Sequence, residues 1–157
     1  MDAIRYCTPG HIFCNAKKVM LAIDGSEGSA KAATVAFEVA EMTKSKLFII
    51  YVIPTGVAEQ FSLMSDTDLK EVLSKYEAKG RKLLDGTKSA ADDYNLDIEL
   101  ILEKGSPSER IILQAKELEV DLIVIGSSGA AGALRSGVGS SAERVLLGAN
   151  NPVLVVK

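Results

Sequence analysis

The sequence predicts an α/β fold in which a parallel sheet lies between two layers of helices. Five short apolar runs are spread along the chain, and most are continuous rather than alternating with polar residues. Continuous runs are typical of strands buried on both faces of a parallel sheet. Helical periodicity fills the segments between them, and the order β-α-β-α-β-α-β-α-β favours parallel strands joined by right-handed crossovers. A length of 157 residues suits a single domain.

The expected strands are rich in Val, Ile and Leu. They are residues 19–23, 47–53, 98–102, 122–125 and 153–156. Glu99 interrupts the third run, which places that strand at or near an edge of the sheet. Tyr51, in the second run, is expected to pack against a helix, and Met20, Met42 and Met64 are expected to fill apolar space.

Four helices are expected between these strands, at 26–44, 66–94, 106–118 and 141–148. The first carries an apolar stripe at Ala32, Val35, Ala36, Val39 and Ala40. In the second, Gly80 and Gly86 lower helix propensity without breaking the apolar period.

Capping signals mark the starts of the last two helices. Ser106, Pro107 and Glu109 form the pattern of a capping box with proline at the first helical position. The same capping pattern is expected at the last helix, with Ser140 or Ser141 as the cap and Glu143 behind it.

Two stretches are expected to be the most mobile, the leader at 1–16 and the connection at 54–66. The leader precedes a domain at 17–157 and contains Cys7, His11 and Cys14. These three residues match no zinc-binding pattern with a fourth ligand, so a flexible or loosely docked leader is the preferred interpretation.

Charge and hydropathy exclude several classes of partner. The net charge is −3 with both signs interspersed, so neither nucleic acid nor an anionic membrane has electrostatic support. No stretch approaches the ~20 apolar residues of a membrane span, and the N-terminus lacks the pattern of a signal peptide. A reduced, cytoplasmic setting is therefore expected.

A glycine-rich loop, "GSSGAAGALRSGVGSS" at 126–141, joins the fourth strand to the last helix. A second polar loop, Asp24-Gly25-Ser26, follows the first strand. Ligands of open α/β sheets bind at the carboxyl ends of strands where the strand order reverses. Bare backbone and a helix N-terminus suit an anion such as phosphate. A flexible loop without a ligand is the alternative, and the sequence contains neither a P-loop nor G-x-G-x-x-G.

Four segments resemble the universal stress protein family. They are "KVMLAIDGSEGSAKAA", "LFIIYVIP", "EKGSPSERIILQAKELEVDLIVIGSSG" and the spaced motif G-x2-G-x9-G-S, formed by Gly126, Gly129, Gly139 and Ser140. The match covers roughly residues 16–157. The resemblance implies a flavodoxin-like sheet of strand order 3-2-1-4-5, a homodimer and, because the glycines are present, the ATP-binding branch of the family.

The resemblance also implies which residues surround the nucleotide. They are Ala22, Asp24, Val52, Ile125, Gly126, Ser128, Gly129, Arg135, Gly139, Ser140 and Ser141. Asp24 would lie by the ribose and phosphates, the Val52 backbone by the adenine, and the glycines and serines around the phosphates. The competing interpretation for Asp24 is a cap on the helix that starts near Ser26.

A carboxylate beside a polyphosphate needs a bridging cation, so Mg²⁺ or Mn²⁺ is expected if ATP is bound, with Asp24 as the candidate metal residue. The loop departs from the family pattern. Ser128 stands where a basic residue is common in the family, and Ser136-Gly137-Val138 stand where apolar residues are usual. Arg135 is the only cation in the loop. AMP and ADP therefore stay open as ligands.

Catalysis has little support in the sequence. The only histidine is in the leader, and no nucleophile lies beside an evident base. The third strand ends in Glu103-Lys104, where a receiver domain would need an aspartate. The sequence predicts an ATP-binding, dimeric stress-response or signalling module with little or no turnover and an unknown client protein. A slow ATPase of the same fold and an interaction module with an empty loop are the alternatives.

The final apolar run, 153–156, predicts how the dimer forms. The implied strand order makes this strand an edge, and an exposed edge must be covered. Pairing with the same strand of a second molecule would give a closed two-fold dimer. The alternative is that the leader of the same chain covers the edge.

Overall fold

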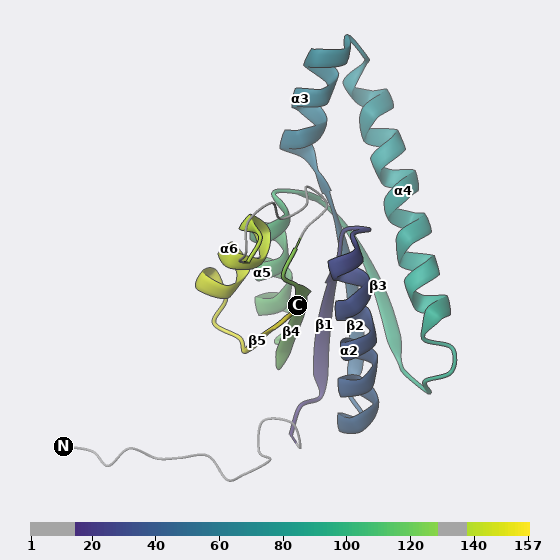
Figure 1. Cartoon of the computed structure of the whole chain (residues 1–157), viewed down its shortest axis with the longest axis vertical. Coiled ribbons are helices and arrows are strands. Elements are labelled where there is room, and N and C mark those ends of the chain that lie inside the picture. Colours follow the sequence, from purple (N-terminus) through teal and green to yellow (C-terminus); the bar gives the residue numbers. More distant parts are fainter. Residues whose placement is uncertain (1–14, 129–137) are drawn as a thin grey trace, which may run out of the picture.

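The computed structural model describes residues 15–128 and 138–157, and Figure 1 shows their arrangement. The elements follow one another as β1 (Lys18–Ile23), α2 (Glu27–Thr43), β2 (Lys46–Pro54), α3 (Thr55–Ser65), α4 (Leu69–Ala90), β3 (Ile98–Gly105), α5 (Pro107–Glu117), β4 (Leu122–Gly126), α6 (Ser140–Gly148) and β5 (Val153–Val156).

The five strands form one parallel sheet in the order β3-β2-β1-β4-β5, as predicted. The chain moves outward from β1 through β2 to β3, then crosses back to β4 and moves outward again to β5. The order therefore reverses between β1 and β4, and β3 and β5 are the two edges. The edge position inferred from Glu99 is confirmed.

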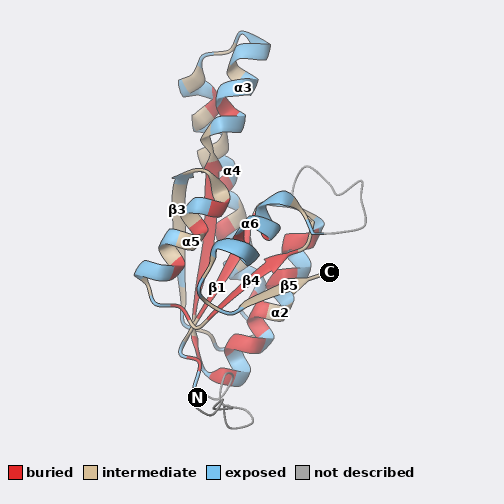
Figure 2. Ribbon diagram, turned by 90° about the vertical axis from the view of Figure 1, so that its left-hand side faces the viewer, coloured by how far each residue is buried: buried red, intermediate tan, exposed pale blue. Residues whose placement is uncertain are grey.

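Each face of the sheet has its own apolar core. Leu21, Ile49 and Val124 belong to the core beneath α2 and α4. The residues that alternate with them, such as Met20 and Ile123, belong to the core beneath α5 and α6. Figure 2 shows the buried residues concentrated along the central strands and the inner side of α2. Burial on both faces explains why the strand sequences are continuously apolar.

The largest departure from the sequence prediction is at 54–66, which was expected to be a connection and contains the helix α3. In Figures 1 and 2, α3 and the first half of α4 extend together beyond the carboxyl ends of the strands. Ala58 is buried, whereas Val57, Phe61 and Met64 are more than half exposed. The spacing of these three residues is helical, which is the signal that the sequence prediction missed.

The expectation that the methionines fill apolar space is correct only for Met20. Met20 is fully buried on β1, whereas Met42 and Met64 are 67% and 89% exposed. Met42 lies near the end of α2 and Met64 near the end of α3, and neither belongs to the two cores of the sheet.

The helix starts differ from the predicted capping pattern. Ser106 is the N-cap of α5 and Pro107 follows at the first position, but no side-chain cap bond forms. The N-cap of α6 is Gly139, and Ser140 is already helical. The reason is that the Gly139 amide donates to the Ser127 carbonyl, which holds Gly139 just outside the helix.

Packing requires a glycine at position 80, even though glycine has a low helix propensity. A Cβ at this position would lie 2.5 Å from Cδ1 of Tyr51, far inside van der Waals contact. The buried Tyr51 ring therefore packs directly on the α4 backbone. The prediction that Tyr51 packs against a helix is confirmed. Over the described residues, no helix is long and apolar enough to cross a membrane.

Candidate functional site

The two polar loops singled out in the sequence lie side by side at the carboxyl ends of β1 and β4. These strands are neighbours, and the strand order reverses between them. The Ser26 hydroxyl donates to the Ser128 carbonyl at 3.3 Å, which joins the loops directly. The site therefore has the position at which ligands of open α/β sheets bind.

Glycines bring the start of α2 against the end of β4. A Cβ on Gly126 would lie 2.5 Å from the carbonyl carbon and oxygen of Gly28, and a Cβ on Gly28 would lie 2.5 Å from the carbonyl oxygen of Ser128. Backbone thus packs on backbone without side chains between. Gly126 has this packing role whether or not a ligand is bound, and Gly28 is a residue of the site that the sequence prediction did not name.

Asp24 shapes the turn after β1. Its Oδ1 accepts a hydrogen bond from the Ser26 amide at 2.8 Å, which is the bonding of an Asx turn. Gly25, between them, has a φ of +87°, which glycine adopts without strain. The cap of α2 is Ser26, whose Oγ accepts from the Ser29 amide at 3.1 Å. The competing interpretation of Asp24 as the helix cap is therefore wrong.

Ala22, Val52 and Ile125 form an apolar layer below the two loops. All three belong to the core on the α5 and α6 side and are only 6–7% exposed. The register pairs Ile23 with Tyr51 and Leu21 with Val124. One residue further along each strand, Val52 reaches the level of Asp24 and Ile125 the level of Ala22.

The glycine-rich loop is closed at its base. The Ser127 amide donates to the Val156 carbonyl at 2.8 Å, and the Gly139 amide donates to the Ser127 carbonyl. Ser140 and Ser141 form the exposed first turn of α6, where helix geometry leaves backbone amides with a partial positive charge. Gly129 and Arg135 were also predicted to bind the nucleotide, and both lie outside the described residues.

The helix α4 reaches the turn after β1 from the face of the sheet opposite to the apolar layer. Burial raises the pKa of the Tyr51 phenol, and the nearby Tyr76 and Asp24 raise it further. Leu83 and Lys79 lie against Gly25. Tyr76 and Leu83 belong to the helix predicted at 66–94, which no sequence pattern connects with the site.

Metal coordination depends on what else is bound. Across 15–128 and 138–157, no three His, Cys, Asp or Glu side chains are grouped so that they could hold a metal ion. Asp24 would supply one carboxylate, and Mg²⁺ or Mn²⁺ needs several oxygen ligands. These residues fit a metal only if phosphate oxygens and water complete its coordination.

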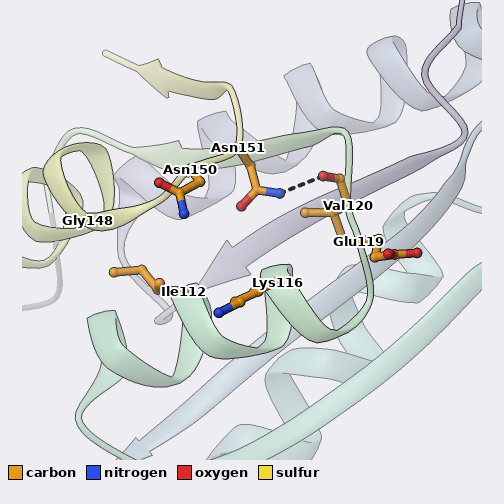
Figure 3. Close-up of a pocket in the computed structure, with 7 residues that line it drawn as sticks. All are labelled: Ile112, Lys116, Glu119, Val120, Gly148, Asn150 and Asn151. Atoms are coloured by element: carbon orange, nitrogen blue, oxygen red, sulfur yellow. Dashed lines mark hydrogen bonds between the residues drawn. The ribbon is translucent and has the colours of Figure 1, made fainter.

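A shallow pocket of about 280 Å³ lies at the opposite end of the strands, beside the starts of β4 and β5. Figure 3 shows it between the second half of α5 and the segment before β5, with the Asn151 amide donating to the Val120 carbonyl at 2.7 Å. It contains none of the predicted site residues and is separated from them by the length of the strands.

Comparison with known proteins identifies the family. A model of the universal stress protein family matches residues 15–157. The chain belongs to the universal stress protein family. It is 32% identical over 141 residues to the universal stress protein MJ0531 of Methanocaldococcus jannaschii, covering 90% of this chain and 82% of that protein. It is also 32% identical to YxiE of Bacillus subtilis, covering 89% and 98% respectively.

Solved structures agree with this assignment. The structure of the protein MJ0577 superposes with a TM-score of 0.79 at 25% identity, covering 90% of this chain and 96% of that one. A universal stress protein solved in complex with cAMP superposes with a TM-score of 0.63 at 25% identity, with the same coverage. The flavodoxin-like fold and the family are thus both established for this universal stress protein.

Proposed function

We propose that this universal stress protein binds an adenine nucleotide, ATP in the first place, across the carboxyl ends of β1 and β4. The observation that carries the proposal is the meeting of the Asp24–Ser26 turn and the Gly126–Ser128 segment where the strand order reverses. The cAMP complex of a similar protein supports an adenine nucleotide as the class of ligand.

The chemistry of the site residues suits them to different parts of the nucleotide. The apolar layer of Ala22, Val52 and Ile125 suits the base and the neighbouring sugar, with the Val52 backbone nearest the adenine. Asp24, at the same level as Val52, suits the ribose hydroxyls and, with ATP, a bridging Mg²⁺ or Mn²⁺.

Phosphates suit the glycine loop and the start of α6. Ser128, Gly139, Ser140 and Ser141 offer amides and hydroxyls there, and the helix dipole favours negative charge at that end. In this proposal Gly129 and Arg135 contribute from the same loop.

Turnover is proposed to be weak or absent, so the protein is a nucleotide-responsive module and not an efficient ATPase. Asp24 already accepts a hydrogen bond from Ser26, and no residue of the described site is an evident general base for activating water. The proposed output is recognition of a client protein by a homodimer formed through β5.

The direct test is to purify the protein, denature it and identify any nucleotide released. Calorimetric titration of the stripped protein with ATP, ADP, AMP and adenosine then gives the affinities. We expect binding of at least one nucleotide, and strong loss of phosphate-dependent affinity in a Gly129→Val, Gly139→Val double variant, because added side chains keep backbone away from phosphate.

Two results would contradict the proposal. Absence of adenine-nucleotide binding in the unmodified protein would favour an interaction module with an empty loop. Sustained ATP hydrolysis on the order of 1 s⁻¹, the low end of ordinary enzymes, would favour the ATPase alternative.

A further inference from the structure

The helix α4 brings a basic side chain to the turn that follows β1. A Cβ built on Gly25 would lie 3.0 Å from Cδ1 of Leu83 and 3.6 Å from Cε of Lys79. The aliphatic stem of Lys79 therefore lies along the turn, and its ammonium nitrogen stands about 1.5 Å beyond Cε, one C–N bond away. Lys79 is an exposed residue, so its charge is available at the surface of the site.

A second residue of α4 lies on the same side. Tyr76 precedes Lys79 by three positions, a spacing that makes side chains neighbours on one helix face. Tyr76 and Asp24 both lie near enough to the buried Tyr51 phenol to act on it electrostatically. Tyr76 and Asp24 thus both lie near Tyr51, and Lys79 lies against Gly25, the residue that follows Asp24.

Two cations near Lys79 on this helix are already paired, whereas neither Lys79 nor Lys82 belongs to an ion pair of the described residues. Lys75 and Arg81 each contact the glutamate four residues earlier, at 3.0 and 2.9 Å. None of the ion pairs found within 15–128 and 138–157 includes Lys79. Its neighbours four positions away are Lys75 and Leu83, so α4 supplies no carboxylate at that spacing.

We propose that Lys79 is a phosphate-binding residue of this site, and that its ammonium contacts a phosphate of the nucleotide held at the Asp24 turn. The inference rests on the proposed function. Asp24 places a negative charge beside an anionic ligand, and the glycine loop at 126–141 supplies a single cation, Arg135. A lysine from α4 offsets this repulsion and gives the site a preference for nucleotides over nucleosides.

The test compares AMP, ATP and adenosine by calorimetric titration at low ionic strength. Lys79→Met keeps an unbranched apolar stem and removes the charge, whereas Lys79→Arg keeps a charge. The matched control is Lys88→Met, because Lys88 is exposed on α4 and lies nine residues on, about half a turn round the helix. We expect about fivefold weaker binding of AMP and ATP in Lys79→Met, the scale of an exposed charge pair. Adenosine binding should stay unchanged, and Lys79→Arg and Lys88→Met should bind like the unmodified protein.

Several outcomes would overturn the role of Lys79. Equal weakening of adenosine and AMP would mean that the lysine stem only supports the turn, and unchanged AMP and ATP affinity would mean that the charge is not used. In that second case the proposed function would still stand. If the unmodified protein bound no adenine nucleotide, both proposals would fail together. If Lys79→Met did not fold, Lys79→Gln would replace it in the same comparison.

Discussion

At the scale of single residues, several glycines of this chain are present because another group occupies the space of their side chain. Gly126 and Gly28 let the end of β4 meet the start of α2, and Gly80 accommodates the Tyr51 ring. Only Gly25 and Gly105 among the described glycines have positive φ. Close packing, more often than unusual backbone conformation, explains the glycines around this site.

Two glycines of α4 provide a matched test of that explanation. Gly80→Ala should destabilise the protein by about 1–3 kcal/mol, since its Cβ would overlap the ring of the buried Tyr51. Gly86→Ala should instead stabilise it by about 0.5–1 kcal/mol, because nothing lies within 4 Å and alanine is the better helix former. Urea unfolding of both variants measures the difference, and equal effects would show that Tyr51 does not pack on Gly80.

At the scale of elements, the start of α2 connects the helix with the candidate site. Ser26 caps the helix through Ser29, while its own hydroxyl reaches the Ser128 carbonyl. The same residue is thus part of both the helix terminus and the contact between the two loops. Loss of its hydroxyl should affect helix stability and loop position together.

Two serines at N-cap positions make this testable. Ser26→Ala should lower the free energy of unfolding by about 1 kcal/mol, the usual cost of losing a capping side chain. Ser106→Ala should have a smaller effect, because Ser106 occupies the N-cap of α5 without a side-chain cap bond. Thermal or urea unfolding compares them. A larger loss for Ser106→Ala would contradict the capping assignment.

At the scale of the whole molecule, β5 is the edge through which we propose that two copies pair. Each of its four residues is partly buried within the protomer. The Pro152 carbonyl accepts a hydrogen bond from the Ile123 amide of β4, and the Val156 carbonyl accepts one from the Ser127 amide just after β4. Because residues of a strand alternate between its two neighbours, the amides of Val153 and Val155 point to the open edge.

The dimer is tested by a substitution that affects this edge alone. Val155→Pro removes an outward amide without removing a bond to β4. We expect the unmodified protein to sediment as a dimer at micromolar concentration and the Val155→Pro protein as a folded monomer, with unfolding measured in parallel. A monomeric unmodified protein would refute pairing through β5. Lysine at Leu154 or Val156 would be a less suitable test, since both side chains pack against the core beneath α2.

The sequence by itself determined the strands, four of the five helices in the described part of the chain, and the polar loops at the ends of β1 and β4. It could do so because burial on both faces of a sheet requires continuous apolar residues, which is a local signal. The edge position of β3 was likewise visible in Glu99. The strand order and the family came from resemblance, which depends on whole segments and a spaced motif.

Tertiary structure alone decided how distant segments meet. The contact between Gly126 and Gly28, and the approach of Lys79 to Gly25, join residues about 100 and 54 positions apart, and no local pattern encodes such pairs. The capping bonds depended on neighbours in the same way, because Gly139 is held by Ser127 across the loop. The local sequence favours certain conformations. Packing then selects among them through contacts that form only when the chain is folded.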